Sequence, residues 1–416
     1  MTSPRLEDLV AREHPVEQAL AAASRPVRTV LDRALDRREL SLDDGLVLLA
    51  TQGDDLAALV RAADHARAED VGPVVTYVVN RNINFTNVCF VGCQFCAFAR
   101  HRKDPDARTD TRAELLAKVQ EAIDRGATEI CMQGGINAEI ESLGYRDLLL
   151  AIKERFPAIH VHAFSPMEIM YGSRRAGMPY REYIAMLKEA GLGTIPGTAA
   201  EILDDDVREI LSHKKVDVQT WVEIITTAHE LGIRTSSTIM YGHLETPQHV
   251  VRHIDILRSI QKRTGGFTEF VPLRFIHTNT ELYRKGLVGE PPPKGEVDLR
   301  MYAFSRLMLR GQIDNLQTSW VKLGTQLSKL SLAAGCNDFG GTLMEEQISK
   351  SAGADAGEFL PVESIRDLIR AMGRIPAERN TTYTSIRPDA AGDGTGDGAG
   401  WRGRSSAVAA GNQLAH

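Results

Sequence analysis

Short apolar segments alternate with amphipathic segments along most of this chain, and this alternation restricts the possible folds more than any other feature. The apolar segments read as buried strands, and each is followed by a segment with helical periodicity. Eight such units are present, with strands predicted over residues 74–87, 128–132, 159–164, 193–195, 234–240, 269–275, 315–320 and 336–339. Repeated strand–helix units favour a parallel sheet with right-handed crossovers, and eight of them predict an α/β fold, a closed (β/α)8 barrel of the TIM type. A six-stranded partial barrel is the alternative.

Three further regions flank the predicted barrel domain, which covers residues 74–350. Residues 1–73 have apolar positions at helical spacing and are predicted to form an N-terminal helical extension. Residues 351–386 are predicted to form a C-terminal helical segment. Residues 387–416 are rich in Gly, Asp and Ala and contain few large apolar side chains, so they are expected to be a disordered tail.

The composition is that of an ordinary globular protein, with 43% hydrophobic and 25% charged residues and a net charge of −6. The basic residues are scattered, so we expect no nucleic-acid partner. No apolar run is long enough to cross a bilayer, and the N-terminus lacks the apolar core of a secretory signal. The odd number of cysteines, five, argues against a disulfide framework and favours a reducing compartment. These features predict a cytoplasmic protein without a membrane partner.

Three of the five cysteines lie together directly after the first predicted strand. Cys89, Cys93 and Cys96 have the spacing C-x3-C-x2-C, with Phe95 before the third cysteine. Thiolates hold iron–sulfur clusters, and three of them would leave one iron of a cubane cluster open to another ligand. A structural zinc ion is the alternative, but it requires four protein ligands, and the nearest further candidate is His101. The spacing is also unlike that of paired zinc knuckles, so it favours an open-site [4Fe-4S] cluster.

Polar residues and glycines gather at the carboxyl ends of the predicted strands, where a barrel of this type has its active site. Each candidate also has a purely structural explanation, as a tight turn, a helix cap or a polar residue in the barrel interior. The candidates for ligand binding are Gln133, Gly134, Gly135, Ser165, Thr198 and Glu201. The candidates for catalysis are His162, Glu168 and His277.

The cysteine motif, with an aromatic residue before its third cysteine, resembles the signature of the radical S-adenosylmethionine (SAM) enzymes. The resemblance implies one [4Fe-4S] cluster on Cys89, Cys93 and Cys96, whose open iron chelates the amino and carboxylate groups of SAM. An electron from the reduced cluster then cleaves the sulfonium and leaves methionine and a 5′-deoxyadenosyl radical. The resemblance also implies that residues 133–135 meet the methionine end of SAM.

The resemblance extends along nearly the whole predicted barrel. The segments on which it rests are NRNINFTNVC, CMQGG, HVHAFSPMEI, GTIPGTAAEIL, SSTIMYGH, GGFTEFVPLRFIH, QTSWVKLG and NDFGGTLMEE. Together they are similar to the enzymes that make the deazaflavin chromophore of coenzyme F-420, and most similar to the tyrosine-using, 4-hydroxyphenyl-transferring half of that family. The resemblance implies that the radical attacks L-tyrosine, that the Cα–Cβ bond breaks, and that the hydroxybenzyl fragment joins 5-amino-6-(D-ribitylamino)uracil. The other product is 2-iminoacetate.

The enzymes of futalosine-type menaquinone biosynthesis share the cysteine loop and the barrel and are the alternative within the superfamily. Only NRNINFTN, TEFVPLRFIH and QTSWVKLG favour the tyrosine-using enzyme. Outside the superfamily, a passive iron–sulfur electron carrier would need neither the glycine-rich segment nor a large barrel, and a non-enzymatic scaffold ranks below it. Release of 5′-deoxyadenosine by the reconstituted protein would separate an enzyme from both.

The resemblance implies two protein partners. An external electron donor of the flavodoxin or ferredoxin type is expected to reduce the cluster. The deazaflavin pathway needs two radical SAM steps, whereas this chain holds a single C-x3-C-x2-C loop. A separate second radical SAM enzyme is therefore expected to close the deazaflavin ring.

Overall fold

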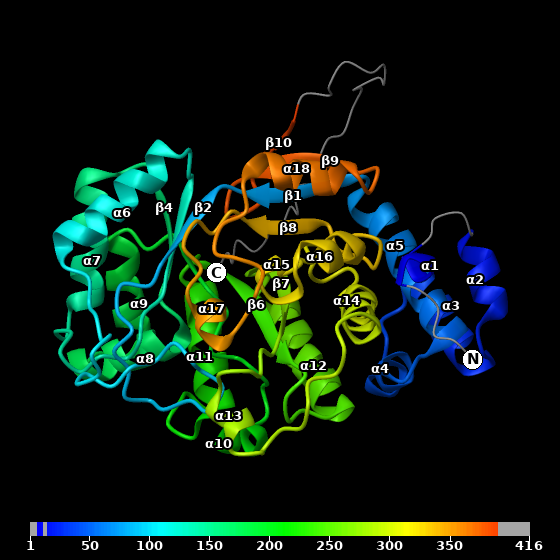
Figure 1. Cartoon of the computed structure of the whole chain (residues 1–416), viewed down its shortest axis with the longest axis horizontal. Coiled ribbons are helices and arrows are strands. Elements are labelled where there is room, and N and C mark those ends of the chain that lie inside the picture. The colour runs from blue at the N-terminus through cyan, green and yellow to red at the C-terminus, as the bar shows by residue number, and fades with distance from the viewer. Residues whose placement is uncertain (1–5, 11–14, 390–416) are drawn as a thin grey trace, which may run out of the picture.

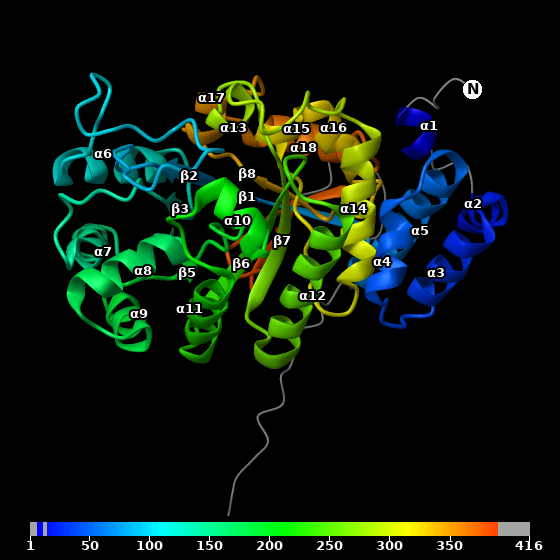
Figure 2. The same ribbon diagram turned by 90° about the horizontal axis from the view of Figure 1, so that it is seen from below.

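The computed structural model describes residues 6–10 and 15–389. Parallel strands form the centre of the molecule, and helices cover their outer side (Figures 1 and 2). Six strands make one continuous parallel sheet in the order β2-β3-β4-β5-β6-β7, which is also their order along the chain. They are β2 (Asn80–Ile83), β3 (Glu129–Met132), β4 (His160–Ala163), β5 (Thr194–Ile195), β6 (Arg234–Tyr241) and β7 (Phe267–Arg274).

The remaining barrel strands are β1 (Val74–Val78) and β8 (Asp338–Gly341), which pair in parallel in a second sheet. β1 leads into β2 through Val79, so the two sheets are continuous along the chain. On the other side, residues 316 and 317 lie between β7 and β8 and form two isolated parallel bridges. Leu316 pairs with Phe270 of β7, and Gln317 pairs with Asp338 of β8. The predicted TIM-type architecture is therefore confirmed as a TIM-like arrangement in which six strands form the continuous sheet. The strand predicted over 315–320 is reduced to these bridges.

The helices between the strands lie on the outside of the sheet (Figure 2). They are α6 (Arg112–Asp124), α7 (Gly144–Arg155), α8 (Pro166–Ala176), α9 (Tyr180–Glu189), α10 (Asp205–Ser212), α11 (Val218–Glu230), α12 (Pro247–Thr264), α13 (Glu281–Arg284), α14 (Glu296–Met308), α15 (Trp320–Leu323) and α16 (Thr325–Ser331). Three of them, α6, α8 and α12, begin with a capping box in which a Thr or Ser hydroxyl accepts a hydrogen bond from a backbone amide of the first turn. Such caps fix where each helix begins after its strand.

The described elements before residue 74 are all helices. They are α1 (Leu6–Val10), α2 (Val16–Ala22), α3 (Arg25–Leu35), α4 (Leu42–Leu49) and α5 (Gly53–Val71). They form a group at one side of the barrel, where α5 packs against α14 (Figure 1). None of the helices in the described part of the chain has both the length and the apolar character needed to cross a lipid bilayer.

The segment after β8 contains α17 (Ile348–Ala352), α18 (Val362–Arg370), β9 (Ile375–Arg379) and β10 (Ile386–Pro388), although the sequence predicts only helix here. β9 pairs in parallel with β1 and antiparallel with β10. The turn between β9 and β10 reaches the ends at which the barrel strands begin, where Thr381 donates a hydrogen bond to Glu129 of β3 at 2.6 Å. Of the predicted tail, residues 387 and 388 belong to β10, and residues 390–416 lie outside the described residues.

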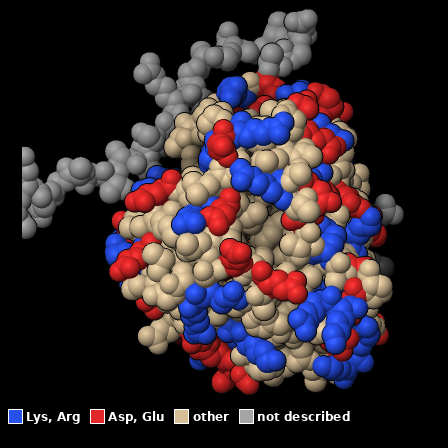
Figure 3. All heavy atoms as spheres, turned by 90° about the vertical axis from the view of Figure 1, so that its left-hand side faces the viewer, with Lys and Arg blue, Asp and Glu red and all other residues tan. Residues whose placement is uncertain are grey.

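Acidic and basic side chains are interspersed over the face that carries α6 to α9, with basic ones more frequent along its lower edge (Figure 3).

Candidate active site

A pocket opens at the carboxyl ends of the barrel strands and encloses about 1270 Å³, part of which is open to solvent. The loops after β2, β3, β4 and β5, the ends of β6 and β7, and parts of α15 and α17 contribute to its wall. All site residues predicted from the sequence line it except His162 and His277. Those that line it are Cys89, Cys93, Cys96, Gln133, Gly134, Gly135, Ser165, Glu168, Thr198 and Glu201.

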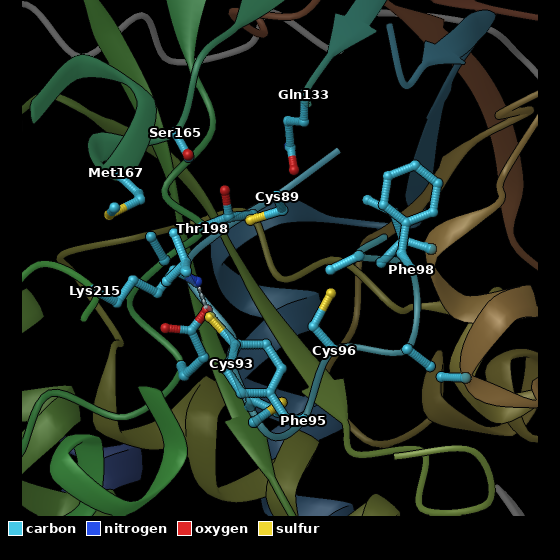
Figure 4. A pocket seen from close by; sticks show the side chains of 18 of the residues that line it. Cys89, Cys93, Phe95, Cys96, Phe98, Gln133, Ser165, Met167, Thr198 and Lys215 are labelled. Carbon is cyan, nitrogen blue, oxygen red and sulfur yellow. Dashed lines mark hydrogen bonds and ion pairs between the residues drawn. The ribbon is translucent and has the colours of Figure 1, made fainter. Parts of the chain in front are cut away.

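The three clustered cysteines are free thiols on the loop after β2. Their sulfur atoms face a common space opposite Gln133 and Ser165 (Figure 4). In the described part of the chain, no group of three His, Cys, Asp or Glu side chains is arranged to hold a single metal ion. A cluster binds each thiolate through a different iron atom, so three free thiols that face one pocket fit a [4Fe-4S] cluster.

The cysteine loop is held in shape by its own backbone and by one arginine. The Cys89 amide donates to the Arg100 carbonyl at 3.0 Å, which closes the base of the loop. The Arg100 guanidinium donates to the carbonyl oxygens of Ala97, Phe98 and Ala99 at 2.9, 3.3 and 3.0 Å. Burial raises the pKa of Cys93 to about 12 and also raises the pKa of Cys96. The thiolate forms therefore need a bound metal group to stabilise them.

The two glycines after β3 are required by contact with the cysteine loop. A Cβ atom on Gly135 would lie 2.3 Å from the Val88 carbonyl oxygen and 2.9 Å from Cβ of Cys89. A Cβ atom on Gly134 would lie 2.6 Å from the ring of Phe85. The absence of a side chain at both glycines thus allows close packing against other parts of the protein.

Glu168 lines the pocket and also caps the start of α8. It is buried, and its carboxylate accepts hydrogen bonds from the Gly134 amide at 3.0 Å and from the Ser165 amide and hydroxyl, both at 2.7 Å. The bonds from Ser165 form the capping box of α8, as the structural explanation of Glu168 predicts. Burial raises the pKa of Glu168 to about 7, although these hydrogen bonds act in the opposite direction.

Glu201, after β5, accepts a hydrogen bond from the ammonium group of Lys215 at 2.5 Å. The Lys215 ammonium also lies 5.0 Å from the centre of the Phe95 ring on the cysteine loop. Ala199 and Glu201 both have positive φ angles, 62° and 41°, which strains the backbone of this turn. The buried Thr198 hydroxyl has no hydrogen-bond partner among the described residues, although it lies in the pocket wall. A ligand hydroxyl or carboxylate in the pocket would satisfy it.

The two predicted histidines contact the protein rather than the pocket. His162 Nδ1 is hydrogen-bonded to the Thr194 hydroxyl at 2.7 Å inside the barrel, and desolvation lowers the pKa of His162 to about 4. The His277 ring packs against Phe275, with 4.4 Å between the ring centres. Their predicted catalytic roles stay predictions, and for His162 the observed contacts match its structural explanation.

Sequence reasoning missed three cations in the pocket wall: Lys215, Arg274 and Lys322. Lys215 lies between α10 and α11, and Lys322 lies on α15, so neither follows a strand directly. A lysine away from a strand end has no sequence pattern that separates it from a surface lysine. The only available signal was that Lys322 belongs to the QTSWVKLG segment and Arg274 to GGFTEFVPLRFIH.

Two known families match successive parts of the chain, and residues from both parts line the pocket. Residues 83–257 match the radical SAM superfamily, and residues 264–390 match the CofH/MqnC C-terminal region. The chain is 49% identical over 359 residues to the 5-amino-6-(D-ribitylamino)uracil–L-tyrosine 4-hydroxyphenyl transferase of Methanothermobacter thermautotrophicus, a match that covers 86% of this chain and 97% of that protein. The chain belongs to this family of radical SAM enzymes. The family implies a [4Fe-4S] cluster and SAM, and the cysteines at 89–96 fit that chemistry.

Two longer relatives match equally well in sequence. The FO synthases of Mycobacterium tuberculosis and Streptomyces avermitilis are both 49% identical to this radical SAM chain, over 379 and 384 residues. These matches cover 90% and 91% of the chain but only 44% and 43% of the two synthases. The chain therefore spans less than half the length of these relatives.

Two solved structures of other proteins have the same fold. Methylornithine synthase superimposes with a TM-score of 0.66 over 84% of this chain and 97% of its own, at 16% identity. The hydrogenase maturase HydG superimposes with a TM-score of 0.66 over 90% of this chain and 81% of its own, also at 16% identity. At such low identity these neighbours support the barrel fold alone.

Proposed function

We propose that the protein is a radical SAM 4-hydroxyphenyl (hydroxybenzyl) transferase, which joins the 4-hydroxybenzyl fragment of L-tyrosine to 5-amino-6-(D-ribitylamino)uracil. The products are the adduct, 2-iminoacetate, 5′-deoxyadenosine and methionine, and the reaction belongs to the biosynthesis of the coenzyme F-420 deazaflavin. The observation that carries the proposal is the 49% identity to the named transferase over 97% of its length. A cytoplasmic location is part of the proposal.

The three cysteines of the loop after β2 would hold the cluster. When bound, the [4Fe-4S] cluster supplies the electron that cleaves SAM. Cys89, Cys93 and Cys96 share one wall of the pocket, and Arg100 fixes the loop that carries them. Because burial raises the pKa of Cys93 and Cys96, both are protonated before loading, and cluster assembly therefore releases protons.

Residues of the matched radical SAM region would position SAM beside these cysteines. They are Gln133, Gly134, Gly135, Ser165, Thr198 and Glu201. The unpartnered Thr198 hydroxyl supports this assignment, because a buried hydroxyl without a protein partner is stabilised by a ligand. Glu168 acts on this segment indirectly, since its carboxylate holds the Gly134 amide in place.

The rest of the pocket is mainly apolar and would hold the aromatic substrate. Phe95 and Phe98 from the cysteine loop, Met240 from β6 and Leu273 from β7 line it. Apolar side chains around a reactive fragment exclude water and limit side reactions. Such a lining suits a phenol ring whose bond to Cα is to be broken inside the protein.

Two partners complete the proposal. An electron donor of the flavodoxin or ferredoxin type would reduce the cluster, and a separate second radical SAM enzyme would close the deazaflavin ring. The part of the FO synthases that this chain does not match supports a division of the pathway between two catalytic units. The chain by itself is thus expected to form an adduct that is not yet a fluorescent deazaflavin.

Anaerobic turnover tests the proposed function. The reconstituted protein is incubated with SAM, a chemical reductant, L-tyrosine and 5-amino-6-(D-ribitylamino)uracil, and the products are identified by mass spectrometry. We expect 5′-deoxyadenosine and a hydroxybenzyl–uracil adduct, with both organic substrates required. Turnover of a carboxyvinyl-oxybenzoate substrate without consumption of tyrosine would instead assign the protein to futalosine-type menaquinone biosynthesis, where aminofutalosine synthase and cyclic dehypoxanthinyl futalosine synthase act.

A further inference from the structure

The pocket wall contains three cationic side chains, and two of them are already paired. The Arg274 guanidinium donates to both carboxylate oxygens of Asp298, at 2.7 and 2.8 Å. The Lys215 ammonium donates to Glu201 at 2.5 Å. Both charges are therefore neutralised by a carboxylate of the protein, which leaves little of either for a ligand.

The third cation, Lys322 of α15, has no such partner. In the described part of the chain its ammonium has no hydrogen bond and no carboxylate within ion-pair distance, 4.0 Å. The nearby acid is Glu346, whose carboxylate instead accepts hydrogen bonds from the Ser349 amide at 3.1 and 2.9 Å. Desolvation lowers the pKa of Lys322, and the charge of Glu346 offsets this only in part. Lys322 is half-buried in the pocket wall, and a partly desolvated cation without a counter-ion is stabilised when a ligand supplies one.

The position of Lys322 separates it from the residues that would bind SAM. Those residues lie within 83–257, whereas Lys322 lies within 264–390, the CofH/MqnC C-terminal region. Cys96 lines the same pocket, so Lys322 shares this space with the cysteine loop. Ile348 and Ala352 of α17 belong to the same C-terminal half and add apolar surface.

We propose that Lys322 binds the carboxylate of the amino acid substrate. The inference rests on the proposed function, which supplies L-tyrosine as that substrate. Of the two organic substrates only tyrosine has a carboxylate, because the ribitylated uracil contains hydroxyl, amino and amide groups. A carboxylate held by Lys322 keeps the amino and Cα end of tyrosine beside α15 and leaves the phenol ring to the apolar wall. Lys322 is thus a substrate-positioning residue of the C-terminal half.

Binding of two matched ligands to the reconstituted holoenzyme tests this assignment. L-Tyrosine and tyramine differ only in the carboxylate, and their dissociation constants can be measured by equilibrium dialysis with labelled ligand in the presence of SAM. We expect the wild-type protein to bind tyrosine at least tenfold more tightly than tyramine, as a charge-assisted hydrogen bond predicts. Lys322→Met should weaken tyrosine binding at least tenfold, leave tyramine binding unchanged, and so abolish the preference.

Three controls accompany the measurement. Lys329→Met makes the same chemical change on α16 at a residue outside the pocket wall and should behave as the wild type. Lys322→Arg should restore part of the preference for tyrosine, and Lys322→Gln replaces the methionine variant if that variant does not fold. The electron paramagnetic resonance signal of the reduced cluster with SAM should be the same in all variants.

Tyrosine binding by Lys322→Met as tight as that of the wild type would overturn the inference, and so would an equal loss of tyrosine and tyramine. An altered cluster potential with unchanged tyrosine affinity would also overturn it, because Lys322 would then act on the cluster. If the wild-type protein cleaves SAM but binds no tyrosine, the proposed function fails and this inference fails with it. Failure of the proposed function is thus visible in the wild type, and failure of the inference alone only in the variant.

Discussion

The Glu168 carboxylate accepts a hydrogen bond from the Gly134 amide at 3.0 Å and thereby ties the start of α8 to the segment after β3. The same carboxylate caps α8 through Ser165. One buried acid therefore fixes the relative position of two loops that line the pocket. Because burial raises the pKa of Glu168, the protonation state of this carboxyl group also affects the stability of the fold.

The stability of the unloaded protein should depend on the protonation of Glu168. The pKa of Glu168 is about 7 in the folded protein and near 4.5 when unfolded, so the folded state binds the proton more tightly. This contribution is present at low pH and is lost as pH rises from about 4.5 through 7, by up to ~3 kcal/mol. Glu168→Gln removes the titration. Denaturation at pH 5, 6, 7 and 8 should show the wild type losing stability relative to the variant, and a constant difference would contradict the assignment.

Substitution of Gly135 should damage the cysteine loop, and not only SAM binding. In Gly135→Ala the new methyl group would lie 2.3 Å from the Val88 carbonyl oxygen, so the loop must move. We expect a lower iron content after reconstitution and a weaker affinity for SAM. Gly289→Ala is the matched control, because a Cβ atom there meets nothing within 4 Å. Normal iron content in Gly135→Ala would show that the loop adapts without cost.

The hairpin formed by β9 and β10 should contribute to global stability. Arg379 of β9 donates to Asp338 of β8 at 2.5 Å, and both residues are buried. Removal of one partner from a buried ion pair typically costs about 3–5 kcal/mol, because the other charge is left unpaired. Arg379→Met should lower the free energy of unfolding by about this amount in denaturant titrations. The exposed Arg387 of β10 offers a control, and equal stability of Arg379→Met and Arg387→Met would refute the role of the pair.

The three clustered cysteines should be required for the cluster, and the other two should not. Cys93→Ala is expected to lose the iron and sulfide of the reconstituted protein and all release of 5′-deoxyadenosine. Cys131→Ala and Cys336→Ala should retain both, since these cysteines do not line the pocket, and burial raises the pKa of each. Full activity of Cys93→Ala would exclude the assignment of the cluster to this loop.

Much of the barrel was predictable because its strands are apolar, short and regularly separated by helices. The residues of 315–320 were predicted as a strand, yet only Leu316 and Gln317 form strand-like bridges and Trp320 begins α15, because an apolar residue such as Trp320 suits a buried helix equally well. β9 was missed because the sequence IPAER contains proline and charged residues. Its strand conformation depends on pairing with β1, which is a tertiary contact.

The candidate site was predictable where a motif marks it, as with the cysteines and Gly134-Gly135. Lys215 and Lys322 could not be found in this way, because only the folded chain brings them into the pocket wall. His162 was placed on the correct strand, but its face of the barrel is occupied by the contact with Thr194. Motifs therefore identified the cysteine loop and the glycine segment, whereas Lys215 and Lys322 required the structure.

The fate of the tyrosine ring tests the proposed transferase function most directly. Ring-deuterated L-tyrosine is supplied to the reduced, reconstituted protein with SAM and 5-amino-6-(D-ribitylamino)uracil, and the products are analysed by mass spectrometry. The proposed function predicts an adduct that contains the aminouracil and the intact deuterated ring, together with 5′-deoxyadenosine and 2-iminoacetate. Release of 5′-deoxyadenosine with the deuterated tyrosine recovered unchanged, and no adduct, would contradict it.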